Sequence, residues 1–184
     1  LVRRDHAKDG GLDFGELFLG APAFNVRFFR RSLFERIGGF DLDYSYSADR
    51  HFLIRARLAG VKSVTLEQVT CIFRSHSHSR TIDPAQQAAD DIIEEHLRMA
   101  KMFSGTIGVD PDTQALLRRW HGFECFRSSC RNLKRFHIGA AQRAIARAFA
   151  FNPAFPLSCI GGWKVWRRAR GREDRRRMLL TEVL

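Results

Sequence analysis

The chain contains 184 residues, 45% of them hydrophobic and 16 of them phenylalanine, and its formal net charge is +11. This composition excludes an intrinsically disordered chain, and the length suffices for a buried core. The sequence contains no run of about 18 apolar residues, which argues against a membrane-spanning helix.

The positive charge is concentrated in the last third of the chain. Residues 118–184 contain 16 Lys and Arg against 4 Asp and Glu, whereas residues 1–117 contain 15 against 16. The C-terminal third is therefore expected to meet an anionic partner. The four cysteines form no C-x-x-C pair, which favours reduced thiols in a cytoplasmic protein.

The N-terminal half is predicted to mix strands with helices. Residues 1–16 are polar and Gly-rich and indicate a loop. Alternation of apolar and polar residues predicts a strand over 24–28 and a second strand over 64–73. The second strand would bring residues 74–81 to one edge of a sheet, where ligands bind in α/β folds.

Two helices are predicted between these strands. Ser32 and Glu35 match the S-x-x-E capping box, which indicates a short helix that ends at Gly38-Gly39. Ser47 is expected to cap a second helix, with Asp49 in its first turn and Gly60 at its end.

The C-terminal half is predicted to be helical. Asp83-Pro84 and Asp110-Pro111 each combine a capping residue with proline at the first helical position. Leu133 and Phe136 are expected on the apolar face of the second of these helices. A third helix is expected after Gly139, ending at Asn152-Pro153. Residues 163–177 interleave tryptophan with arginine, as in a helix that lies on a membrane surface.

Three segments in this order carry a resemblance to a known family. They read R-R-S-L-F-E-R-I-G-G-F-D, then A-D-R-H-F-L-I-R-A-R-L-A-G, then F-R-S-H-S-H-S-R-T, within residues 17 to 81. The chain resembles the C-terminal half of a family-2 glycosyltransferase with the GT-A fold. This implies an α/β, Rossmann-like half-domain at 1–82, followed by an α-helical extension at 83–184 with a basic amphipathic tail.

The resemblance implies a catalytic role for Asp49. The matching acidic residue in the family deprotonates the acceptor hydroxyl in an inverting transfer from a nucleotide-sugar. Ala48 stands where the family often has a glutamate, so a mechanism with paired carboxylates is in doubt. Without the family pattern, Asp49 is explained by stabilisation of its helix N-terminus.

The loop after the second predicted strand is similar to the family's donor-binding loop, with Arg74, His76, Ser79 and Thr81 expected on the diphosphate. His76 is also a candidate metal ligand, and a polar surface loop is the alternative. Gly39 and Asp41 are expected on the acceptor side. A divalent cation, Mg²⁺ or Mn²⁺, is implied, with its main acidic ligands in an N-terminal half that this sequence does not contain.

The first residue is Leu1, and no D-x-D precedes residue 30, so the chain is expected to be a fragment of an enzyme of polysaccharide or cell-envelope biosynthesis. The isolated chain is expected not to turn over. Implied partners are a nucleotide-sugar and a glycan or lipid-linked acceptor. The expected location is cytoplasmic, at the inner face of the cell membrane.

A second hypothesis from another class stays open. The chain is then a noncatalytic helical interaction module that binds an anionic membrane or nucleic acid through its basic tail. No nucleic-acid-binding motif is present, and no specific nucleic acid is expected. A membrane is favoured for residues 163–177, because the acceptors of such transferases are often envelope or lipid-linked glycans; a solvated basic tail without a partner is the remaining alternative.

Overall fold

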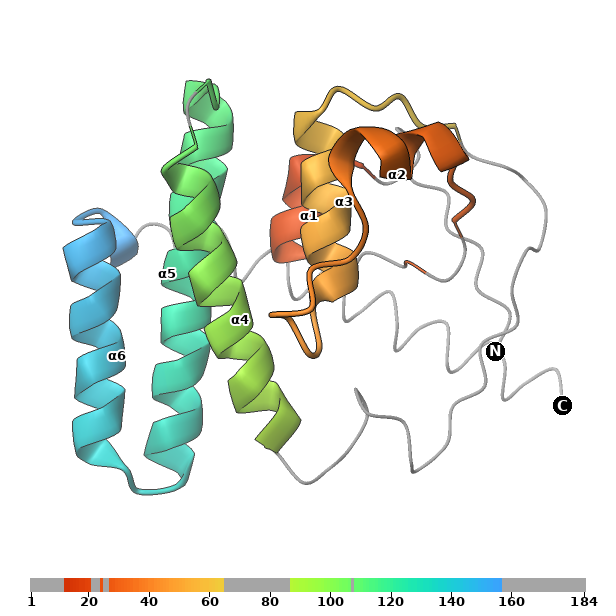
Figure 1. Cartoon of the computed structure of the whole chain (residues 1–184). Helices are drawn as coiled ribbons and strands as arrows, with labels where there is room; N and C mark the ends of the chain where they lie inside the picture. Colours follow the sequence, from red (N-terminus) through yellow and green to blue (C-terminus); the bar gives the residue numbers. More distant parts are fainter. Residues whose placement is uncertain (1–11, 21–23, 25–26, 65–86, 107, 157–184) are drawn as a thin grey trace, which may run out of the picture. The chain divides into compact units, whose positions relative to one another are not determined.

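The computed structural model describes residues 12–20, 24, 27–64, 87–106 and 108–156. These residues form six helices in two compact units (Figure 1). The N-terminal unit contains α1 (Phe14–Leu19), α2 (Arg31–Ile37) and α3 (Ala48–Leu58). The three-helix unit contains α4 (Gln87–Ser104), α5 (Pro111–Lys134) and α6 (Ile138–Phe151).

The predicted α/β fold is wrong, because the residues that the structure describes contain helices and no strand. In the predicted strand 24–28, the N–H of Arg27 donates to the carbonyl of Phe24 across 3.1 Å, which closes a turn. Phe28, expected on a buried face, is 77% exposed. Of the second predicted strand, 64–73, only Val64 is described, and it is also exposed.

The start of the described chain is a helix where the sequence predicted a loop. The carboxylate of Asp13 accepts a hydrogen bond from the N–H of Gly15 and caps α1. Leu17, Phe18 and Leu19 are buried in this short helix. The polar residues of this segment indicated a loop, and the apolar face of the helix becomes evident only from its packing against α3.

Phe52 on α3 is the centre of the N-terminal unit. It is fully buried, and four other phenyl rings lie with their centroids 5.0–6.2 Å from its own. Leu33 of α2 and Ala56 of α3 complete the buried cluster. The surrounding rings belong to Phe24, Phe29, Phe34 and Phe40.

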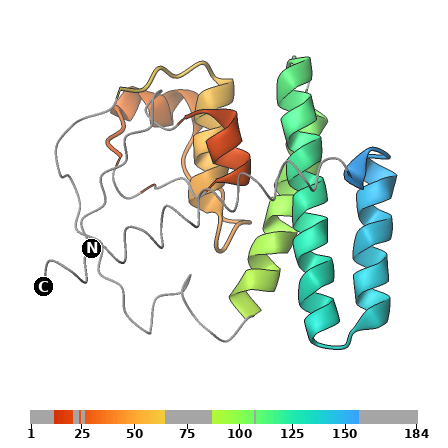
Figure 2. The same cartoon turned by 180° about the vertical axis from the view of Figure 1, so that it is seen from behind.

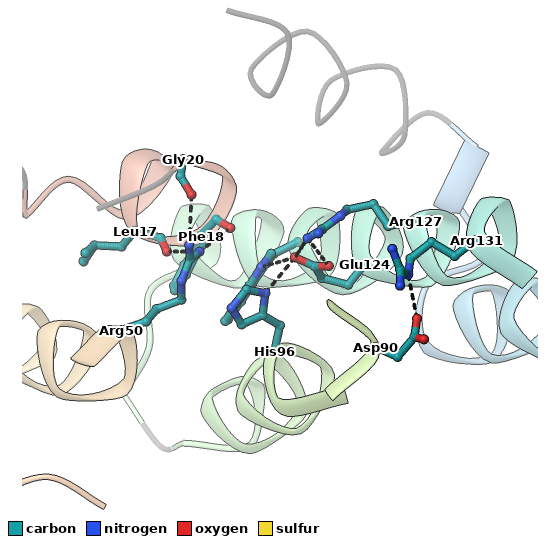
Figure 3. Close-up of polar contacts among 10 residues, drawn as sticks. Leu17, Phe18, Gly20, Arg50, Asp90, His96, Glu124, Arg127 and Arg131 are labelled. Atoms are coloured by element: carbon teal, nitrogen blue, oxygen red, sulfur yellow. Dashed lines mark hydrogen bonds and ion pairs between the residues drawn. The ribbon is translucent and has the colours of Figure 1, made fainter. Parts of the chain in front are cut away.

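Arginine side chains close the C-terminal ends of these helices. Arg50 donates to the carbonyls of Leu17, Phe18 and Gly20 at 2.7, 3.1 and 2.9 Å (Figure 3), which satisfies acceptors that α1 leaves without helical partners. Arg55 donates in the same way to the carbonyls of Ile37, the last residue of α2, and of Gly39, and Arg36 donates to the carbonyl of Ala59 after α3.

Local capping signals in this unit were predicted with mixed success. Ser47 occupies the N-cap position of α3, as expected, although its side chain makes no capping hydrogen bond, and Gly60 follows the helix with φ of 71°. The Ser32–Glu35 capping box is wrong, because α2 begins at Arg31 and Ser32 lies inside the helix. Glu35 instead pairs with Arg31 across 3.2 Å on the exposed surface.

In the three-helix unit, α5 lies between α4 and α6, a relation that both views show (Figures 1 and 2). Asp110 caps α5 through the N–H of Thr113, as the Asp110-Pro111 signal predicted. The core draws on all three helices and on the turn after α6; its buried members are Ile93, Leu97, Cys125, Ala148 and Phe155.

The predicted division at 82/83 lies in a segment outside the described residues and stays a prediction. Within the described helices, no segment combines the length and apolar character needed to cross a bilayer.

Candidate functional site

The acceptor-side and base residues predicted from the sequence lie in the N-terminal unit. Asp49 is in the first turn of α3, where it was expected, and its Oδ1 accepts from the N–H of Arg50 at 2.7 Å. Asp41 accepts from the N–H of Asp43 at 3.0 Å, so one oxygen shapes the turn before α3. Gly39 supplies a carbonyl to Arg55. These contacts explain all three residues structurally.

His51 was missed by the sequence reasoning, although it lies two residues after Asp49. The ring is buried, packs at a tilt against Tyr44 with centroids 4.7 Å apart, and has Nδ1 3.7 Å from Oδ2 of Asp41. Burial and the charge of Arg55 lower the pKa of His51, against the opposing effect of Asp41. His51 therefore joins the turn to α3 as a mainly neutral ring.

The predicted donor-binding residues Arg74, His76, Ser79 and Thr81 lie outside the described residues, as does the basic segment 163–177. The structure therefore does not bring them together with Asp49. Within the described ranges, no group of three His, Cys, Asp or Glu side chains is arranged to hold a metal ion. The divalent cation stays a prediction.

Comparison of the chain with models of known protein families, with curated proteins and with solved structures gives no match. The resemblance to family-2 glycosyltransferases is therefore wrong. No family model supports it, and helices occupy the described part of the segment that was expected to form a sheet. The first two motifs that suggested the resemblance correspond to α2 with its glycine turn and to α3. Many folds contain two helices joined in this way.

A buried polar cluster in the three-helix unit has Glu124 at its centre (Figure 3). Its carboxylate is nearly inaccessible and lies 2.9 Å from Nδ1 of His96 and 3.3 Å from Nε1 of Trp120. Arg127 donates to both carboxylate oxygens, at 3.0 and 2.7 Å. The cluster ties α4 to α5, and its close pairing indicates a structural role.

His121, one position after Trp120, gives the unit a pH dependence. The ring is buried and stacks on Phe151 at 4.0 Å, and burial, with the charges of Arg147 and Lys101, lowers its pKa to about 4. His121 therefore binds a proton near pH 6.5 in the unfolded chain, but only near pH 4 in the folded unit. Stability is expected to fall by about 1 kcal/mol or more as the pH drops from 6.5 towards 4.

This expectation is checked by urea denaturation at several pH values, with His121→Phe as the comparison. The phenyl ring keeps the stacking on Phe151 and cannot be protonated. The variant is expected to lose less stability than the wild type over the same pH interval. Equal losses in the two proteins would assign the dependence to other groups.

The end of the three-helix unit at the α5–α6 turn carries exposed apolar side chains, which we call the apolar tip. Its members are Leu133, Phe136 and Ile138, which are 49%, 88% and 53% exposed. The sequence predicted Leu133 and Phe136 on the buried face of α5, and this is wrong. Helical periodicity ends at Lys134, so Phe136 no longer follows that face.

Exposed cationic side chains accompany the apolar tip. Residues 125–156 contain six Lys and Arg and no Asp or Glu. Four of the six pair with acidic residues, among them Arg131 and Arg135, which share Asp90 at 2.6 Å and, against the effect of burial, lower the pKa of its carboxyl. Lys134 and Arg143 are exposed and form no ion pair among the described residues.

Proposed function

We propose that the chain is a noncatalytic helical interaction module that binds an anionic membrane surface peripherally. The observation that supports this proposal is the joint exposure of the apolar tip and of Lys134, His137 and Arg143 at one end of the three-helix unit. Membrane surfaces accept this combination, because apolar side chains enter the acyl boundary while cations stay among anionic headgroups.

Among the described residues near the apolar tip, ion pairs neutralise most of the cations and leave two of them exposed. Four arginines of residues 125–156 are paired: Arg127 with Glu124, Arg147 with Glu94, and both Arg131 and Arg135 with Asp90. A methyl group at Gly139 would lie 3.5 Å from Nη1 of Arg143, so this guanidinium reaches back over the first turn of α6. Lys134 and Arg143, which have no ion-pair partner in the described ranges, thus lie next to the apolar tip.

A membrane fits these residues better than a nucleic acid. Phosphates attract Lys and Arg on any polyanion, and an aromatic ring can stack on an unpaired base. Exposed Leu133 and Ile138 gain nothing from phosphates, whereas a bilayer removes them from water. The basic segment 163–177 is predicted to add to the same interaction.

The test removes two charges at this end of the unit. Lys134→Ala with Arg143→Ala is expected to weaken binding of the full chain to phosphatidylserine-containing vesicles by about 30-fold, since each cation near an anionic surface contributes about 1 kcal/mol. Vesicle sedimentation measures the partition coefficient. The matched control, Lys101→Ala with Arg118→Ala, removes the same charge, and Arg118 lies about 24 Å along α5 from Lys134.

The control is expected to bind nearly as the wild type does. Equal weakening by both double variants would mean that net charge alone governs binding and that the α5–α6 end is not the site. Binding to duplex DNA at physiological salt, without binding to the vesicles, would replace the membrane by a nucleic acid.

Sugar transfer by Asp49 stays a prediction from the sequence. Asp49 occupies its expected place, but each donor-binding residue assigned to that reaction lies outside the described residues.

A further inference from the structure

Phe136 combines two features that a protein normally avoids. Its φ is +60°, the left-handed region that bulky side chains rarely adopt, and its side chain is 88% exposed. It is the one residue other than glycine with positive φ in the part of the chain that the structure describes.

The hydrogen bonds around Phe136 explain the backbone but not the side chain. The N–H of His137 donates to the carbonyl of Asn132 at 2.9 Å, and the N–H of Phe136 to that of Leu133 at 3.0 Å. This is the Schellman pattern, in which the residue after the C-cap is left-handed and is usually glycine. Glycine would make the same two bonds without the steric strain of a Cβ.

The phenyl ring gains little within the protein in return for this strain. An exposed phenyl buries too little surface to compensate, and the neighbouring Leu133 and Ile138 are about half exposed themselves. Residues held in unfavourable backbone regions cluster at functional sites. Figures 1 and 2 show the short turn that joins α5 to α6, and the phenyl ring of Phe136, which belongs to this turn, is exposed.

We infer that Phe136 is the insertion residue of this module: together with Leu133 and Ile138 it enters the acyl boundary of an anionic bilayer. The inference rests on the proposed function and assigns the step that follows electrostatic adsorption. A bilayer suits this surface because three apolar side chains on a protruding turn need no shaped pocket, whereas a protein partner has to supply one. Lys134 and Arg143, which are exposed in the last turn of α5 and the first turns of α6, would then meet the anionic headgroups.

The decisive variant is Phe136→Gly in the full chain. Glycine relieves the positive φ, and its extra freedom in the unfolded chain offsets part of the gain, so the melting temperature is expected to rise by about 2–4 °C. Binding to vesicles of phosphatidylcholine with phosphatidylserine is expected to weaken about 10-fold. A ring needed for folding would lower the melting temperature instead.

Two further variants make the readout specific. Phe136→Trp keeps an aromatic side chain suited to the interface and is expected to bind as tightly as the wild type. Phe28→Ala removes an equally exposed phenyl ring from the N-terminal unit and is expected to leave binding unchanged. Brominated acyl chains should quench the fluorescence of Phe136→Trp more strongly than that of the wild type.

The outcomes separate the two proposals. If the wild type binds anionic vesicles and Phe136→Gly binds equally well, insertion by Phe136 is wrong while the membrane module stands. If the wild type does not bind these vesicles, both are wrong. A fall in the melting temperature of Phe136→Gly would also overturn the inference, because the ring would then have a structural role.

Discussion

Glu124→Ala is expected to lower the free energy of unfolding of the three-helix unit by about 3–5 kcal/mol. The substitution removes the acceptor that His96 Nδ1 and Trp120 Nε1 contact at 2.9 and 3.3 Å, in surroundings where water cannot replace it. It also leaves the guanidinium of Arg127 without both of its carboxylate partners. Urea denaturation followed by circular dichroism measures the loss.

The matched control is Glu94→Ala, which breaks an ion pair of similar length with Arg147 at 2.9 Å. Both side chains of that pair are about half exposed, so water compensates and the expected loss is at most about 1 kcal/mol. Similar losses for the two variants would show that burial of the Glu124 cluster does not set its contribution. Because the cluster joins α4 to α5, Glu124→Ala is expected to lower the stability of the unit even under conditions in which membrane binding is still unchanged.

Phe52→Ala is expected to lower the free energy of unfolding of the N-terminal unit by about 3–5 kcal/mol. The side chain is fully buried, and its ring touches aromatic neighbours before α2, within α2 and after it. Alanine leaves a cavity among the four phenyl rings that surround Phe52. Thermal and urea unfolding of the full chain detect the change.

Phe28→Ala supplies the comparison for Phe52→Ala, because it removes the same atoms from a ring that is 77% exposed. Its expected effect lies within about 0.5 kcal/mol. If both substitutions destabilise the protein alike, the phenyl cluster is not the core of this unit. If neither does, the packing around α3 contributes less than its burial indicates.

Signals that act locally predicted several elements well. The Asp110-Pro111 pair marks the start of α5, Ser47 marks the start of α3, and Asn152 ends α6. Each depends on backbone donors or acceptors within one turn of helix, so the sequence of a few residues suffices. The free thiols of Cys125 and Cys130 agree with the predicted absence of a disulfide between them.

Signals that depend on distant packing failed. Alternating phenylalanines around 24–28 indicated a strand, yet Phe24 and Phe29 both turn towards Phe52, and no backbone ladder forms in the described residues. An aromatic cluster around one helix produces the same letters as a half-buried strand. The predicted strand at 24–28, and with it part of the α/β interpretation, depended on this ambiguity.

The candidate membrane site was only partly visible in the sequence. The excess of cations in the last third predicted an anionic partner, but pointed to residues 163–177, which the structure does not describe. Phe136 was assigned to the buried face because it continues the helical spacing of α5. Phe136 is exposed because α5 ends at Lys134 and Phe136 itself adopts the left-handed backbone conformation of the turn. The sequence had placed the break between the two helices three positions later, at Gly139.

The most direct measurement is hydrogen–deuterium exchange of the full chain with and without anionic vesicles. The proposed contact predicts slower exchange at residues 138–140, the first amides of α6, which have no acceptor within the helix, and unchanged exchange at 41–47. Protection confined to 163–177, or to the N-terminal unit, would contradict the assignment of the α5–α6 end as the membrane-binding surface.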